Sequence, residues 1–256
     1  MKNYEFWFVV GSQFLYGPEV LETVAARAAE MADKMNEGGL LPFKLVYKAT
    51  VKTNEEITNI VKEANYRDEC AGIVAWCHTF SPSKMWINGF VDLQKPYCHL
   101  ATQYNETIPN EEIDMDFMNL NQSAHGDREY GHIVSRMGIE RKVVVGYWND
   151  EDVLKRIASW MRTAIGCIES SHIRILRVGD NMRNVAVTEG DKVEAQIKFG
   201  WEIDAYNITD IAEYVNAVEQ NEINALVDEY YSKYDILLEG RDPEEFRKHV
   251  AVQAAI

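Results

Sequence analysis

The segment NQSAHGDREYGH contains side chains whose types and spacing could bind a metal ion. If this segment is helical, His125, Glu129 and His132 stand at i, i+4 and i+7 and share one face. Imidazole and carboxylate are ordinary ligands of divalent metals, so this face could serve a metal-dependent hydrolase. A solvated helix face with a few histidines gives the same pattern, and two glycines weaken the helix. A third interpretation has His125 contacting a ligand from the helix N-terminus.

Two Cys-His pairs lie near the ends of strand-like segments, namely Cys77-His78 and Cys98-His99. A thiol beside an imidazole could bind zinc or act as a nucleophile if the two strands are neighbours. Adjacent residues of a strand face opposite sides of the sheet, so Cys98 and His99 cannot serve one site together. A buried free cysteine also commonly packs as a small apolar residue. The sequence places no third group that would orient such a pair for catalysis.

A polar loop, GSQFLYG, follows the first apolar segment and leads into a helical one. It lacks the glycine patterns GxGxxG and GxxxxGK[ST] that hold phosphates, so a dinucleotide is a poor candidate ligand. Ser12, Gln13 and Tyr16 are neutral groups that both donate and accept hydrogen bonds, which suits a hydroxyl-bearing ligand. The alternative is a turn whose polar side chains merely cap the next helix.

Aromatic residues in WCHTFSPSKMWING offer a further surface for a sugar ring, because Trp76, Phe80 and Trp86 are close in the sequence. Such side chains also fill protein cores. Trp86 falls inside the helix that the Ser-Pro-Ser signal is expected to start, so the core interpretation is favoured for it.

Strand-like segments rich in Val, Ile and aromatic residues alternate with helical segments, which predicts a parallel sheet covered on both faces. The expected strands are Tyr4–Val10, Phe43–Tyr47, Gly72–Trp76, Tyr97–Thr102 and Lys142–Gly146. The expected helices are Glu19–Asn36, Asn54–Asn65, Pro82–Leu93, Ser123–Met137 and Glu151–Glu169, the second with a capping box between Thr53 and Glu56. The fold class is therefore α/β with a doubly wound parallel sheet. The loops after its first, third and fourth strands should converge on one crevice, at Gly11–Gly17, Cys77–Ser81 and Gln103–Asn105.

A second α/β unit begins after this domain. We expect strands at His172–Val178 and Trp201–Tyr206, and helices at Asp191–Phe199, Asp210–Gln220, Glu222–Tyr234 and Pro243–Ile256. Two strands are few for a doubly wound domain, and the last helix ends at Ala-Ala-Ile without a Gly, Asn or basic cap. The predicted organisation is an N-terminal domain at 1–170 and the incomplete start of a central domain at 171–256.

The composition narrows the class of partner. The chain has 256 residues, of which 46% are hydrophobic, enough to fill a substantial core. Its 26 Lys and Arg against 41 Asp and Glu make nucleic acid and anionic membranes poor partners. The sequence shows neither a membrane-spanning apolar run nor an export signal, and its four cysteines form no CxxC pair. We therefore expect a cytoplasmic protein with free thiols.

Several long segments together resemble the bacterial L-arabinose isomerase family. They are FVVGSQFLYGPE, HTFSPSKMWING, DMDFMNLNQSAHGDREYG, RVGDNMRNVAVTEGDKVEAQIKFGW and NALVDEYY, and the resemblance runs in order from about Tyr4 to the last residue. It implies an aldose–ketose isomerase that converts L-arabinose to L-ribulose with a divalent metal, typically manganese. The family fold has an N-terminal and a central α/β domain followed by a mostly β domain.

The resemblance also implies which residues touch substrate. In this sequence the family's sugar-pocket positions match Gln13, Leu15, Tyr16, Gln122, His125 and Met182. The glutamine and histidine side chains would bind hydroxyls, while Leu15, Tyr16 and Met182 would form an apolar wall. In the family's homo-oligomers this region completes the active site of a neighbouring subunit. D-galactose remains a possible second substrate.

The glutamates and histidines that hold the metal and move the proton in this family match no part of the present sequence. The resemblance therefore implies that the present chain is truncated and inactive alone. It would have no catalytic residue and no manganese ligand of its own. The resemblance also argues against a metal on His125, Glu129 and His132, because the family's metal is held elsewhere. A sugar-binding module without catalytic activity is the alternative function.

Overall fold

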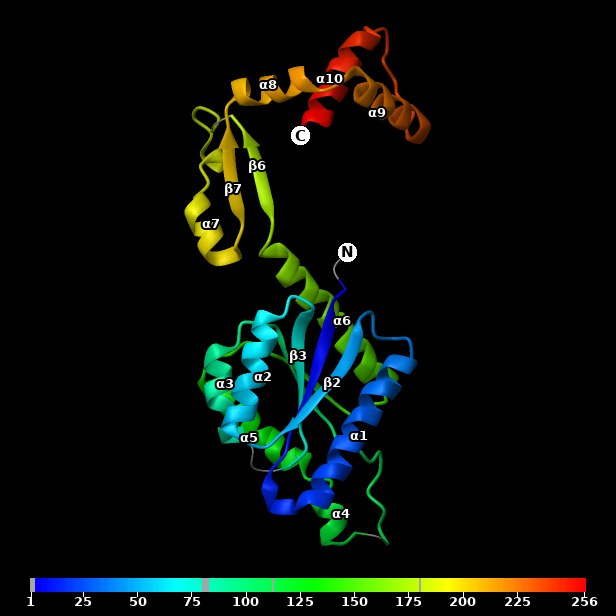
Figure 1. Ribbon diagram of the computed structural model, residues 1–256, viewed down its shortest axis with the longest axis vertical. Coiled ribbons are helices and arrows are strands. Elements are labelled where there is room, and N and C mark those ends of the chain that lie inside the picture. Colours follow the sequence, from blue (N-terminus) through cyan, green and yellow to red (C-terminus); the bar gives the residue numbers. More distant parts are fainter. Residues whose placement is uncertain (1–2, 80–82, 112, 180) are drawn as a thin grey trace. The chain divides into compact units, whose positions relative to one another are not determined.

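The computed structural model describes residues 3–79, 83–111, 113–179 and 181–256. The chain forms two compact units, the first extending to Glu169 and the second starting at Ser170 (Figure 1).

The first unit is built on a five-stranded parallel sheet in the order β2-β1-β3-β4-β5 (Figure 1). The strands are β1 (Glu5–Gly11), β2 (Lys44–Val51), β3 (Cys70–Cys77), β4 (Tyr97–Ala101) and β5 (Lys142–Val145). The doubly wound α/β fold expected from the sequence is thus confirmed. The chain passes from β1 outward to β2 and returns to β3 on the other side of β1. The winding therefore reverses between β1 and β3, and their carboxyl ends form the usual ligand crevice of such a sheet.

Helices cover both faces of this sheet (Figure 1). One face carries α1 (Pro18–Glu37) and α6 (Glu151–Ser170), and the other carries α2 (Asn54–Tyr66), α3 (Ile87–Asp92) and α5 (Ser123–Arg136). Successive side chains of a strand point to opposite faces of the sheet, so they enter two separate cores. Phe6 and Phe8 of β1 pack with α1 and α6, whereas Trp7 packs with α2 and α3. Trp76 and Trp86 are both buried, so the core interpretation holds for each.

The start of α2 is capped by the residues that the sequence indicated. The Thr53 hydroxyl accepts a 3.1 Å hydrogen bond from the Glu56 N–H. The Glu56 carboxylate accepts its 2.7 Å bond from the N–H of Lys52 rather than that of Thr53, so the capping box reaches one residue further back than expected.

Some expected elements differ in the structure. The single helix expected at Pro82–Leu93 is a 3₁₀ turn, η2 (Ser83–Trp86), followed by α3, and Pro82 lies outside the described residues. Phe80 and Ser81 lie outside them too. The structure adds short helices that the sequence did not indicate: η1 (Phe14–Tyr16) after β1 and α4 (Met115–Asn119) before α5. Segments this short carry too few apolar repeats to give a periodic pattern.

The second unit contains a parallel strand pair, β6 (Arg174–Val178) and β7 (Glu202–Tyr206). It also contains η3 (Ala186–Thr188), α7 (Lys192–Phe199), α8 (Ile208–Ala217), α9 (Gln220–Lys233) and α10 (Pro243–Ala255). The helix expected at Asp210–Gln220 begins earlier, because Asn207 and Asp210 form a capping box that starts α8. Four buried side chains, from α9 and α10, make a small core of their own: Ile223, Val227, Val250 and Ala251.

The predicted thiol state is confirmed, since all four cysteines are free. Within the described ranges, no helix is both long enough and apolar enough to cross a bilayer.

Candidate functional site

The loop after β1 brings neutral polar side chains to the crevice. Ser12 is buried directly after the strand, Gln13 is extended, and η1 follows. Gly17, at φ 82°, then turns the chain into Pro18 at the start of α1. A side chain at φ above zero is strained, so glycine suits this sharp reversal.

The hydroxyl of Tyr16 joins three segments of the chain. It accepts a 3.3 Å hydrogen bond from Nε2 of Gln13 and donates one of 3.3 Å to Oε1 of Gln122. It also hydrogen-bonds the hydroxyl of Thr79, which follows β3. A phenolic oxygen offers one donor and two acceptor positions, and these three partners can fill all of them. The structure therefore brings together Gln13, Tyr16 and Gln122, which lie in two separate segments of the sequence.

The first turn of α5 lies against the loop after β3 because Gly126 has no side chain. A Cβ at this position would lie 1.9 Å from the Thr79 carbonyl oxygen, a distance that no packing allows. The Ser83 hydroxyl donates a 3.2 Å hydrogen bond to the Gly126 carbonyl and fastens the same contact. Gly126, which weakens the helix when judged by propensity alone, is thus what lets Gln122 and Thr79 reach one hydroxyl.

A buried histidine ties the loops after β1 and β3 together. Nδ1 of His78 lies 3.2 Å from the hydroxyl of Ser12. Burial lowers the pKa of His78 to about 4, with a smaller contribution from the positive charge of Arg27. The imidazole is therefore neutral at physiological pH and holds the loop as a hydrogen-bonding group rather than as a charge.

The remaining residues expected to line a sugar pocket are exposed. Leu15, the middle residue of η1, is 73% exposed, and His125 is exposed on α5. A depression of about 350 Å³ is lined by His125 together with Met118, Gln122 and Ala124. Met182 belongs to the second unit, where it is 63% exposed.

The metal hypothesis based on His125, Glu129 and His132 is wrong for this structure. Among residues 3–79, 83–111, 113–179 and 181–256, a single group of three potential ligands converges, and it does not contain these side chains. It consists of Cys77, His99 and Asp127. The three exposed side chains share a helix face, but their ligand atoms do not come close enough to hold one ion.

Thr79 and Asp127 are residues that the sequence did not single out. The sequence gives no local signal for Thr79, because its partner, Tyr16, is 63 residues away. Asp127 provides the third group that the Cys-His pairs lacked, and it bonds His99 at 2.6 Å. For Asp127 the available signal was its place directly after Gly126. Only the structure shows that Gly126 packs against Thr79 and that Asp127 meets His99.

Comparison with known proteins accounts for both units. The model of the L-arabinose isomerase N-terminal domain matches residues 1–172, and that of the L-arabinose isomerase central domain matches residues 174–256. The chain belongs to the L-arabinose isomerase family. Family relatives that carry this name include proteins of Geobacillus thermodenitrificans, 54% identical over 256 residues, and Clostridium acetobutylicum, 55% identical over 255. L-arabinose isomerase 2 of Bacillus licheniformis is 56% identical over 251 residues.

These L-arabinose isomerase family matches cover 100%, 100% and 98% of the present chain, and 52%, 52% and 53% of the respective relatives. The chain thus spans about half the length of the curated relatives it matches.

Proposed function

We propose that this chain supplies the sugar-binding edge of an aldose–ketose isomerase that converts L-arabinose to L-ribulose. The observation that carries this proposal is the group of hydrogen bonds around the Tyr16 hydroxyl, at the carboxyl ends of β1 and β3. Amides and hydroxyls that both donate and accept match the hydroxyl groups of a sugar. Gln13, Gln122 and His125 bind these hydroxyls, and Leu15 and Tyr16 give the apolar wall.

The same side chains explain why we expect no turnover from the chain alone. The partners of Tyr16 are two amides and a hydroxyl, none of which accepts a proton from carbon at neutral pH, and His125 is assigned here to hold a substrate hydroxyl rather than to act as the base. Moving a hydrogen between the first two carbons of an aldose requires such a base. In this proposal the base is on polypeptide that matches the remaining half of the relatives.

Manganese does not fit the ligands that this chain offers. Manganese is bound best by carboxylate, carbonyl and water oxygens, with imidazole acceptable. The only converging group of potential ligands among the described residues includes the Cys77 thiol, a soft ligand that manganese does not favour. No step of the reaction is therefore assigned to manganese held by these residues.

Neighbouring subunits of a homo-oligomer are the proposed partners, and the cytoplasm is the proposed location. Leu15 and Phe14, exposed side by side on η1, are available to such a neighbour. The free cysteines are compatible with a reducing compartment.

The test is complementation. The chain is assayed for ketose with L-arabinose and manganese, alone and mixed with the part of the Geobacillus thermodenitrificans relative that it does not match. We expect ketose only from the mixture, with the rate lowered at least about tenfold by Gln13→Ala or His125→Ala, because each removes a hydrogen bond to substrate. D-galactose in place of L-arabinose measures the second candidate substrate.

Matched variants control this test. Gln94→Ala removes an exposed glutamine that follows α3, and His132→Ala removes an exposed histidine of the same helix as His125. Both should leave the rate of the mixture unchanged. Ketose from the chain alone would refute the assignment of the base to other polypeptide. If the mixture binds sugar by calorimetry but never forms ketose, the chain is a binding module instead.

A further inference from the structure

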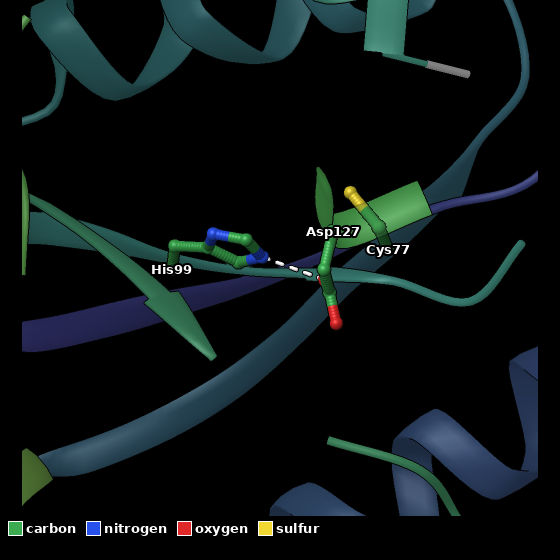
Figure 2. A group of neighbouring side chains, drawn as sticks. All are labelled: Cys77, His99 and Asp127. Carbon is green, nitrogen blue, oxygen red and sulfur yellow. Dashed lines mark hydrogen bonds and ion pairs between the residues drawn. The ribbon is translucent and has the colours of Figure 1, made fainter. Parts of the chain in front are cut away.

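Three side chains of different elements meet beneath the carboxyl edge of the sheet. Cys77 ends β3, His99 lies in β4, and Asp127 lies in the first turn of α5. Figure 2 shows Nε2 of His99 joined to one carboxylate oxygen of Asp127, with the Cys77 side chain next to that of Asp127. The three ligand atoms all lie within 4.8 Å of one another.

The alternation of side chains along a strand explains why the cluster takes one residue from each Cys-His pair. Cys98 belongs to the core under α1 and α6, whereas Cys77 belongs to the core under α2, α3 and α5. Since neighbouring residues of a strand alternate, His99 faces the same side of the sheet as Cys77. Each Cys-His pair is thus split, and one member of each forms the cluster.

The three side chains of the cluster are buried together. Cys77 is fully buried and His99 is 2% exposed, while the Asp127 side chain is 13% exposed. A thiolate and a carboxylate bound to one divalent cation are neutralised together, so an ion held here leaves no uncompensated charge in the core.

An ion has a route to the cluster through Asp127. This residue lines a cavity of about 400 Å³ beyond β4 and β5, together with Thr102, Ser123 and Tyr147. Water in that cavity can supply a further ligand to an ion held by the three side chains.

We propose that Cys77, His99 and Asp127 bind a zinc ion. Thiolate, imidazole and carboxylate are the three ligand types of protein zinc, and three protein ligands with one open position form a common zinc geometry. The thiol proton leaves to solvent, and the imidazole proton moves from Nε2 to Nδ1, so that zinc, thiolate and carboxylate sum to zero charge. Zinc bonds of roughly 2.0–2.3 Å require the ligand atoms to close by about an ångström, which side-chain rotation allows.

This site is separate from the isomerisation. Its thiolate selects a soft or borderline metal, not manganese, and none of its ligands bonds Tyr16, Gln13 or Gln122 in the structure. Zinc binding here therefore has a readout that does not depend on sugar or on turnover.

The test uses the full chain, freed of metal and titrated with cobalt(II) and then zinc. Cobalt bound to a thiolate gives a charge-transfer absorption in the near ultraviolet, and zinc should displace it at one ion per chain. Cys77→Ser should abolish this absorption, and competition should show zinc affinity at least about 100-fold weaker. Thermal unfolding of each variant checks that it is folded.

Two other cysteines give matched controls. Cys98→Ser changes a buried thiol that faces the opposite core, and Cys167→Ser changes an exposed thiol, so both should keep the absorption. Asp127→Asn retains the shape of its side chain and should weaken zinc binding while leaving the thiol in place. The proposal is overturned if the parent chain gives no absorption, or if Cys77→Ser keeps it. It is overturned equally if Cys167→Ser loses it, or if folded Asp127→Asn binds zinc as tightly as the parent.

Discussion

The hydroxyl of Tyr16 donates a 3.3 Å hydrogen bond to Gln122, which lies 106 residues further along the chain. This single contact joins η1, after the first strand, to the start of α5. Thr79, after β3, bonds the same hydroxyl, so the segments that line the crevice meet at one oxygen atom. The polar side chains proposed to bind sugar are held in place before any ligand arrives.

Tyr16→Phe should destabilise the protein although it removes only one oxygen. Three hydrogen-bonding partners lose their contact, and each typical bond contributes about 1 kcal/mol net. Because the site is partly exposed and water replaces some partners, we expect a loss of about 1–2 kcal/mol in urea unfolding. Tyr66→Phe, at an exposed tyrosine, is the control and should change stability by no more than a few tenths. Equal effects of the two variants would contradict the role assigned to Tyr16.

Alanine at two glycines of the same helix should have opposite effects. Helix propensity favours alanine over glycine by about 1 kcal/mol at both positions. At Gly126 the new Cβ would lie 1.9 Å from the backbone oxygen of Thr79, so we expect Gly126→Ala to lose roughly 2–3 kcal/mol. At Gly131 the nearest atom is the end of the flexible Arg141 side chain at 3.2 Å, and Gly131→Ala should gain about 0.5–1 kcal/mol. The free energy of unfolding of both variants, measured by chemical denaturation, tests this prediction. A stabilised Gly126→Ala protein would show that the contact between Gly126 and Thr79 is not tight.

Removal of the Thr53 hydroxyl should weaken the start of α2. Thr53→Ala leaves the N–H of Glu56 without its 3.1 Å partner and should cost about 1 kcal/mol. Thr53→Ser retains the hydroxyl and should keep most of the stability. Hydrogen exchange of the first turn of α2 should accelerate in the alanine variant alone. Unchanged exchange would mean that the Glu56 side chain is sufficient to cap the helix.

Alkaline pH should destabilise the fold in part through Cys70. Burial raises the pKa of this thiol from its usual 9.0 to about 11. The unfolded chain therefore loses the thiol proton at lower pH than the folded chain, so stability is retained below pH 9 and falls as pH rises toward 11. This one group should account for about 2 kcal/mol over that range. In urea unfolding across the range, Cys70→Ala should show a shallower loss than the parent, while Cys167→Ala, at an exposed thiol, should follow the parent. Parallel curves for Cys70→Ala and the parent would contradict the prediction.

The sequence alone determined the class of fold and much of its local structure. Alternating apolar segments and helical repeats predicted the parallel sheet, and Thr53 predicted the start of α2, because both signals depend on residues within one or two turns of each other. The opposite facing of Cys98 and His99 followed from strand geometry in the same way. The segments similar to the L-arabinose isomerase family were likewise visible as local strings of residues.

The tertiary structure alone decided which side chains meet. Spacing along a helix grouped His125, Glu129 and His132, but a shared face does not bring ligand atoms together at one point. The groups that do converge, Tyr16 with Gln122 and Cys77 with His99 and Asp127, come from separate elements. Their meeting depends on the order of the strands in the sheet and on how closely α5 packs beside Thr79, and these are set by packing over the whole domain, which no local pattern of residues encodes.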